Sequence, residues 1–382
     1  MRHHNTLLHA ILKPMPWGRF DRLVDKHGAD KGVRRLSTRS QLLALIHAQL
    51  SGAVSLREIE ATISSHRDRL YHLGAVAPRR STLADANRIR PAEVFVDLFQ
   101  SLLAQAHPGL RRAAREAVRL IDSTSMRLNG LSRSWASGQV ESAGAKLHVV
   151  FDPDAQVPVH FAVTGQRIND ITVAKMLPIE AGATYVFDLG YYDFSWWNSL
   201  ISKGCRVVTR LKTNTRTTII RERSVAPGGP VLTDRIVRLP TRLAASRTSP
   251  CASDMRELTV VIPTGKTLRI VSNDLVSPAE TIADLYKTRW QIELFFRWVK
   301  QTLKIKKFLG TSENAVRVQL AVALIAYLLL KIAHAAQTTI QSPLTFARLT
   351  RSNLMHRTTI GGLAAPPLRP APQTSQQLGF AL

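Results

Sequence analysis

Two acidic residues stand where their side chains could hold a metal ion. Asp122 follows the apolar stretch 117–121 and Asp188 follows the apolar stretch 184–187, and both stretches have the pattern of a short strand. Carboxylates at the carboxyl ends of strands in an open α/β sheet lie where ligands bind. They could meet at one divalent cation, because Mg²⁺ is typically held by one or two carboxylates together with phosphate oxygens. Taken singly, each aspartate is equally explained as a turn residue at a strand end.

Glu293 is the third candidate, on a predicted helix, 285–304. Four residues share its face, since each residue of a helix turns by about 100°: Tyr286, Arg289, Arg297 and Lys300. The segment Tyr286–Lys307 carries seven Lys or Arg but one carboxylate. An ordinary amphipathic helix with a solvated charged face would explain a charged stripe. A lone acid among cations also fits a metal ligand beside residues that hold a DNA backbone.

Together, Asp122, Asp188 and Glu293 predict a two-metal site that acts on phosphodiester bonds. One ion would activate water or a 3′-hydroxyl, and the other would stabilise the leaving oxygen. Trp290 is a candidate for stacking on a displaced base, although packing against the protein explains it equally well. Asp170 is expected to cap a helix rather than to support this site.

The overall charge indicates a polyanionic partner. The chain has 382 residues, with 52 Lys and Arg against 27 Asp and Glu, a formal net charge of +25. Hydrophobic residues at 45% and charged residues at 21% exclude a wholly disordered chain. Two cysteines exclude a disulfide framework and fit a reducing compartment. The longest apolar run, 320–330, is too short to span a bilayer, so we expect a cytoplasmic protein without a membrane partner.

The predicted elements place these residues in an α/β protein with a mixed sheet. The first residues, 1–115, are helical in pattern and carry 19 Lys or Arg against 9 Asp or Glu, which fits a DNA-binding module or simply a solvated helical domain. Ser277, Pro278 and Glu280 are expected to open the glutamate helix as N-cap, first residue and capping box. Five segments are predicted: a helical DNA-binding domain 1–112, a first catalytic part 113–205, a β-rich insertion 206–276, a second catalytic part 277–337 with the glutamate helix and the next helix, and a basic, loosely ordered tail 338–382.

The spacing Tyr286-x2-Arg289-x3-Glu293-x6-Lys300 matches, at all four positions, the Tyr-Arg-Glu-Lys signature of the IS4 family of bacterial insertion-sequence transposases. Further segments resemble those of the family: 120–124 and 187–191 around the two aspartates, and 146–148 and 208–212 in the flanking strands. The 105-residue gap between the second aspartate and the glutamate leaves room for the β-rich insertion of these enzymes.

The resemblance implies an RNase H-like catalytic domain in which the three acids bind two Mg²⁺ or Mn²⁺ ions. It implies nicking at the terminal inverted repeats of an insertion sequence and joining of the freed 3′-hydroxyl to target DNA. The partners would be double-stranded DNA and a second copy of the chain in a homodimer that pairs two ends, at the bacterial nucleoid. Tyr286, Arg289 and Lys300 would contact phosphates near the cut.

Two other functions remain open. A non-catalytic or domesticated DNA-binding protein derived from a transposase would keep the basic surface, but the intact set of three acids argues against it. A host nuclease of the same fold would give no reason for the Tyr-Arg-Lys pattern around Glu293.

Overall fold

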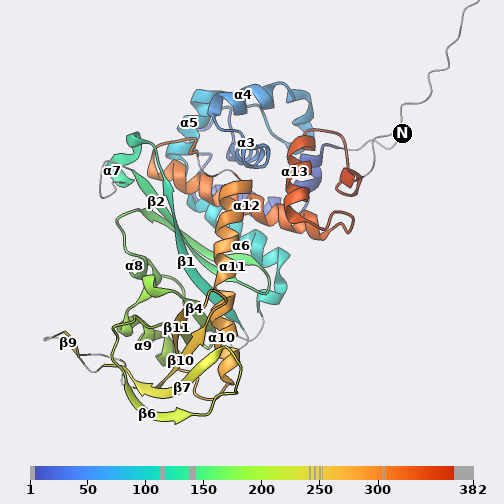
Figure 1. Ribbon diagram of the computed structural model, residues 1–382. Helices are drawn as coiled ribbons and strands as arrows, with labels where there is room; N and C mark the ends of the chain where they lie inside the picture. Colours follow the sequence, from blue (N-terminus) through green and yellow to red (C-terminus); the bar gives the residue numbers. More distant parts are fainter. Residues whose placement is uncertain are drawn as a thin grey trace, which may run out of the picture.

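The computed structural model describes residues 5–111, 117–136, 143–240, 242–244, 247–248, 251, 253–303, 305 and 307–364. In Figure 1 helices gather at one end of the molecule, the sheet runs through its middle, and strands β6 and β7 lie at the other end. The site residues all belong to the middle part, so the account of the fold concentrates there.

The amino-terminal part of the chain is helical, as its apolar periodicity predicts. Its helices are α1 (Leu7–Leu12), α2 (Trp17–Lys26), α3 (Thr38–Ser51), α4 (Leu56–Ser64), α5 (Arg80–Ile89) and α6 (Glu93–Ala106). The buried helix α3 begins where the Ser37 side chain accepts from the N–H of Ser40, and it ends at Gly52 with φ of 79°. Both are ordinary ends for a helix, since a serine satisfies a free N–H and glycine adopts the left-handed conformation without strain.

A nine-stranded mixed sheet forms the middle of the molecule, in the order β3-β2-β1-β4-β5-β11-β10-β7-β6. Its strands are β1 (Val118–Arg127), β2 (Gly144–Asp152), β3 (Val157–Gly165), β4 (Thr184–Phe187), β5 (Arg206–Arg210), β6 (Thr218–Arg223), β7 (Val231–Arg238), β10 (Met255–Val261) and β11 (Thr267–Ser272). β1, β4 and β5 are parallel, and β2 and β3 are antiparallel to their neighbours. The predicted α/β class with a mixed sheet is confirmed, and the first five strands fit an RNase H-like fold.

The predicted β-rich insertion, 206–276, begins with β5, and its later strands extend the sheet beyond it. β11 pairs antiparallel with β5, and β10, β7 and β6 follow outward. β8 (Arg242–Ala244) and β9 (Arg247–Thr248) form a separate pair. These strands therefore continue the mixed sheet beyond β5.

Helices cover both faces of the sheet. Successive side chains of a strand point to opposite faces, so Leu120 and Val149 pack in one hydrophobic cluster and Ile121 and Val150 in the other. α8 (Asp170–Ala174) and α9 (Phe194–Ser202) cover the face of Ile121, while α10 (Ala279–Thr288), α11 (Trp290–Thr302) and α12 (Glu313–Ala335) contribute to the cluster of Leu120. Trp196 and Trp197, which were predicted to lie in the core, are buried in the same hydrophobic cluster as Ile121.

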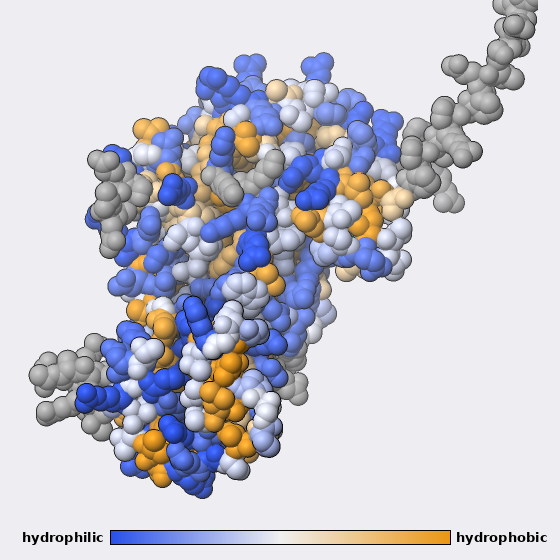
Figure 2. All heavy atoms as spheres, viewed as in Figure 1, coloured by the Kyte–Doolittle hydropathy of each residue, from blue (hydrophilic) through white to orange (hydrophobic). Residues whose placement is uncertain are grey.

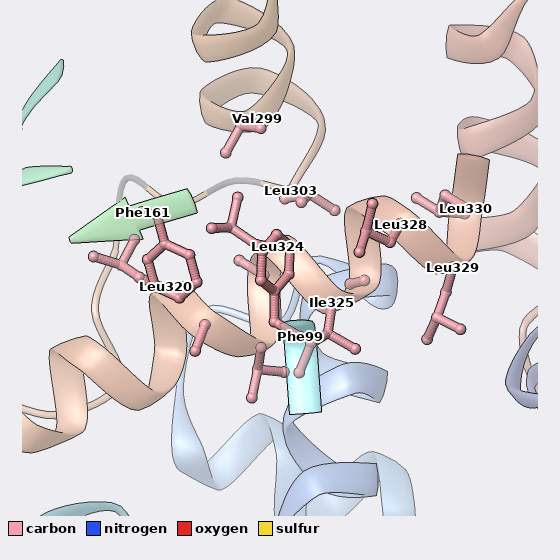
Figure 3. Close-up of a cluster of buried hydrophobic side chains, with 14 of the residues drawn as sticks. Phe99, Phe161, Val299, Leu303, Leu320, Leu324, Ile325, Leu328, Leu329 and Leu330 are labelled. Carbon is pink, nitrogen blue, oxygen red and sulfur yellow. The ribbon is translucent and has the colours of Figure 1, made fainter. Parts of the chain in front are cut away.

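The second helix predicted after the insertion, α12, joins the sheet to the amino-terminal helices. Leu320, Leu324 and Ile325 lie close to Phe99 of α6, with Val299 of α11 and Leu303, the residue after α11, on the other side (Figure 3). α12 is the one helix in the described part of the chain long and apolar enough to cross a membrane, but 78% of its most apolar window is buried inside the protein. A helix buried all round is the expected centre of a large core.

The segment predicted as a loosely ordered tail is ordered over part of its length. Residues Pro343–Asn353 form α13, which begins with the Ser342 side chain accepting from the N–H of Thr345. Phe346 and Ala347 are buried in the main hydrophobic cluster, and their burial against α3 and α12 holds the helix in spite of its polar composition. Residues 365–382 lie outside the described part of the chain. The remaining helical elements are short: α7 (Arg133–Ala136), η1 (Arg67–Arg69), η2 (Tyr71–Leu73), η3 (Pro108–Arg111), η5 (Gly130–Ser132), η6 (Leu189–Tyr191) and η7 (Gly361–Ala364).

Candidate active site

Asp122 and Asp188 leave adjacent parallel strands at the same level of the sheet. Ile121 of β1 pairs with Phe187 of β4, so the two aspartates are the next residues on neighbouring strands. β4 ends at Phe187, as predicted. β1 does not end at Asp122 but continues to Arg127, because the antiparallel strand β2 keeps pairing with it after β4 has ended. The expected strand-end position is thus correct for Asp188 and wrong for Asp122.

Arg289 connects Glu293 of α11 with Asp122 of β1. Arg289 Nη2 donates to Glu293 Oε1 at 2.5 Å, and Arg289 Nη1 lies 3.8 Å from Asp122 Oδ2. The three side chains are only partly exposed, at 16% for Arg289, 18% for Asp122 and 32% for Glu293. One guanidinium therefore links the helix acid to the strand acid.

Asp188 and Glu293 both act electrostatically on Asp122. Burial is the largest cause that raises the pKa of Asp122 to about 7, and the charges of Asp188 and Glu293 act in the same direction. The Ser123 N–H and the Arg289 charge oppose the rise. The pKa of Arg289 is itself raised above its usual value despite burial, by Tyr286 and by the two acids that it contacts. Arg289 thus lies between two of the three carboxylates.

The glutamate helix is interrupted at Arg289, which corrects the predicted single helix 285–304. α10 ends at Thr288 and α11 begins at Trp290, and the Arg289 and Ile292 N–H groups bond to carbonyls three residues back. This tightening of the helix is a local 3₁₀ turn. Arg289 therefore occupies the junction between the two helices, beside the acids.

Contrary to the prediction from the sequence, Ser277 is not the N-cap residue of the helix. Pro278 occupies the N-cap position of α10, with no side-chain cap. The Ser277 N–H bonds instead to Asp274 Oδ1, and the Ser277 carbonyl accepts from the buried Arg256. The helix start is thus fixed by tertiary contacts with the sheet, which local sequence signals do not report.

The side chains that are predicted to contact DNA differ in how much of their surface is exposed to solvent. Tyr286 is 7% exposed, with the Arg289 guanidinium carbon 5.9 Å from its ring centre. Trp290 is 49% exposed, and the Arg297 guanidinium carbon lies 5.9 Å from its ring centre. Lys300 Nζ donates to the carbonyl of Ser125 on β1 at 3.0 Å. Figure 2 shows hydrophilic residues over α11 on this face of the molecule.

The three acids are not arranged here as a preformed metal-binding site. Within the residues that the structure describes, no group of three or more His, Cys, Asp and Glu side chains stands ready to hold an ion. The donor set nevertheless fits a divalent cation, since Asp122, Asp188 and Glu293 offer oxygen ligands and share a negative field that Arg289 only partly neutralises. A metal ion would take over the role that the guanidinium has here.

Behind the aspartates lies a polar group that the sequence did not assign to the site. Asp170 is the first residue of α8, and its side chain caps nothing, because Asn169 holds the N-cap position. Its Oδ1 accepts instead from Ser123 Oγ at 2.9 Å and from Lys146 Nζ at 3.0 Å. The expected helix-capping role is therefore wrong.

The fold and the acids define the class: a mixed α/β protein with carboxylates from two adjacent strands and a helix at one place on the sheet. The model of the transposase DDE domain family matches residues 113–329, and a domain of unknown function matches residues 3–76. The chain is 40% identical over 296 residues to "Putative transposase y4zB" of Sinorhizobium fredii, covering 76% of this chain and 82% of that protein. The chain belongs to the DDE transposase family.

Other relatives carry related names. The chain is 31% identical over 259 residues to "Probable transposase for insertion sequence element IS5377" of Geobacillus stearothermophilus, covering 66% of each chain. It is 45% identical over 53 residues to "Putative transposase for insertion sequence element IS4SA" of Synechocystis, which is 14% of this chain and 16% of that protein. A piggyBac transposase synaptic complex with hairpin DNA, solved by cryo-electron microscopy, has a TM-score of 0.48 and 12% identity, over 95% of this chain and 83% of that one.

Proposed function

We propose that this transposase is an active IS4-type enzyme that cuts DNA at the terminal inverted repeats of an insertion sequence and joins the 3′-hydroxyl ends to target DNA. The single observation that supports the proposal is the arrangement of the three acids: Asp122 and Asp188 follow paired residues of adjacent strands, and Arg289 bridges Glu293 to Asp122. These are the acids that the Tyr-Arg-Glu-Lys pattern and its two aspartate segments single out.

The proposed chemistry uses these acids as ligands for two Mg²⁺ or Mn²⁺ ions. Bound there, the ions would lower the pKa of the attacking water or 3′-hydroxyl and neutralise the leaving oxygen. The protein's own part is positioning: the strand register sets Asp122 beside Asp188, and α11 brings Glu293 to them. Preorganised charge of this kind supplies much of the rate of phosphoryl transfer.

The cations around the acids are proposed to hold DNA phosphates. Arg289 is the N-cap residue of α11, and Arg297 and Lys300 lie further along the helix. Tyr286, in α10, is the first residue of the Tyr-Arg-Glu-Lys pattern, and its hydroxyl is proposed to contact a phosphate as well. Trp290, half-exposed beside Arg297, offers a stacking surface for an unpaired base. The basic amino-terminal helices are proposed as the module that binds the inverted repeats, and a homodimer would pair two ends.

A strand-transfer assay tests this function against its two alternatives. The full chain is incubated with Mg²⁺ or Mn²⁺, a duplex ending in the inverted repeat that flanks its gene, and a supercoiled target. Joining of the donor 3′-end to the target is the expected result. Nicking without joining would indicate a nuclease, and binding of the repeat without either reaction would indicate a non-catalytic DNA-binding protein. Either outcome would overturn the proposal.

A further inference from the structure

Each of the two aspartates accepts a hydrogen bond from a backbone N–H, and both of these N–H groups belong to residues that lie near Asp170. Asp122 Oδ1 accepts from the backbone N–H of Ser123 at 2.7 Å, and Asp188 Oδ1 accepts from the backbone N–H of Gly190 at 2.8 Å. Each bond fixes one oxygen of a carboxylate. Asp170 is hydrogen-bonded to Ser123 and lies close to Gly190.

Asp170 reaches Ser123 through a hydrogen bond and Gly190 through close packing. Ser123 Oγ donates to Asp170 Oδ1 at 2.9 Å. At Gly190, an added Cβ would lie 3.0 Å from Asp188 Oδ1 and 3.6 Å from Asp170 Oδ2. There is thus little room for a side chain between Asp170 and Asp188, and Gly190 allows α8 to pack directly behind the second aspartate.

Asp170 acts from the face of the sheet opposite to Glu293. Neighbouring residues of a strand point to opposite faces, so the Ser123 side chain lies with α8 while Asp122 lies on the face of α11. Ser123 pairs with His148 of β2 in the strand register. The contact between Asp170 and Asp122 therefore passes through the backbone of β1.

Asp170 is itself held in place by the strands beneath it. Lys146 Nζ donates to its Oδ1 at 3.0 Å and to the Ile168 carbonyl at 2.9 Å. His148 Nδ1 lies 3.7 Å from the same oxygen, but burial lowers the pKa of His148 to about 4, so the imidazole is neutral near pH 7 and this approach is no ion pair. The imidazole is fixed on its other side, with Nε2 2.8 Å from Thr164 Oγ1. Lys146 is therefore the cation that neutralises Asp170.

We infer that Asp170 is a positioning residue, which sets the spacing and orientation of Asp122 and Asp188 for metal ions through Ser123 and Gly190. This inference rests on the proposed function and deepens it. A carboxylate neutralised by Lys146 and bonded to Ser123 is not a metal ligand itself. Groups of this kind behind metal ligands typically contribute about 10- to 100-fold to metal affinity or activity.

The test compares the full chain with Asp170→Ala, Asp170→Asn and Ser123→Ala, measuring Mn²⁺ affinity by titration calorimetry and the kinetics of DNA nicking. Asp170→Ala should weaken Mn²⁺ binding and lower kcat by roughly 10- to 100-fold while the KM for DNA stays unchanged. Asp170→Asn keeps an oxygen that accepts from Ser123, so it should retain most of the wild-type metal affinity. Ser123→Ala should match Asp170→Ala, and the double variant should be no worse than either, as expected of residues in one chain of contacts.

Asp193→Ala provides the matched structural control. Asp193 caps α9 through the Trp196 N–H and pairs with Lys175 at 2.6 Å, so its loss should lower stability without changing Mn²⁺ affinity. Unchanged Mn²⁺ affinity and kcat in Asp170→Ala, or a loss that only follows stability as in Asp193→Ala, would overturn the inference while leaving the proposed function intact. A wild-type chain that neither binds Mn²⁺ nor nicks DNA would overturn both.

Discussion

Arg289 and Glu293 form an ion pair 2.5 Å long, one turn apart, at the start of α11. The same guanidinium lies 3.8 Å from Asp122, so a residue proposed to hold a DNA phosphate here neutralises two proposed metal ligands instead. A phosphate that drew Arg289 away would free both acids. DNA binding and metal binding are therefore expected to favour each other, because coupling between two ligands is reciprocal.

Replacing this arginine tests the coupling. Arg289→Ala should raise Mn²⁺ affinity in the absence of DNA by roughly 10-fold, the effect of one removed charge interaction worth about 1.4 kcal/mol, and should weaken DNA binding. Titration calorimetry on the DNA-free protein measures the first effect. Arg297→Ala, which removes an exposed arginine stacked near Trp290, is the matched control and should leave metal affinity unchanged. Lower or equal Mn²⁺ affinity in Arg289→Ala would refute the coupling.

Glu293→Gln should separate chemistry from DNA binding. The substitution removes a ligand charge but no cation, so nicking should fall by more than roughly 1,000-fold while affinity for the inverted repeat stays within a few-fold. Gel-shift titration and single-turnover cleavage measure the two quantities. A parallel loss of binding and cleavage would count against Glu293 as a metal ligand.

Lys300→Ala should weaken DNA binding to all sequences alike. A phosphate contact contributes about one unit to the slope of log affinity against log salt, so the slope should flatten by about that amount. Lys203→Ala removes the same charge from the C-cap of α9, on the opposite face of the sheet, and should change neither affinity nor slope. An unchanged slope in Lys300→Ala would contradict a phosphate contact by Lys300.

The pKa of Asp122 predicts how stability depends on pH without divalent ions. Its pKa is raised from 3.8 to about 7, so the native state binds a proton that the unfolded state releases, and the free energy of unfolding should fall as pH rises from about 4 to 7. Asp122→Asn cannot titrate and lacks this contribution, which amounts to at most about 4 kcal/mol. Denaturant unfolding in EDTA at several pH values compares the two. Parallel curves would contradict the raised pKa.

Much of the fold, and the elements that carry the three candidate acids, could be predicted from the sequence, because short-range patterns determine them. Apolar stretches before Asp122 and Asp188 gave β1 and β4, and the spacing of charged residues led to Glu293. The interruption of the glutamate helix at Arg289 could not be predicted, since nothing local in its sequence breaks a helix. The contacts of Asp170 were also missed, because they join α8 to β1 across 47 residues and depend on the register of the sheet.

Metal-dependent nicking of supercoiled DNA is the most direct test of the central claim that Asp122, Asp188 and Glu293 form one catalytic site. The wild-type chain is predicted to nick DNA carrying its inverted repeats with Mg²⁺ or Mn²⁺ and to stop in EDTA. Asp122→Ala and Asp188→Ala should each abolish nicking while the proteins stay folded and still bind DNA. Nicking at the wild-type rate by either variant would contradict the claim.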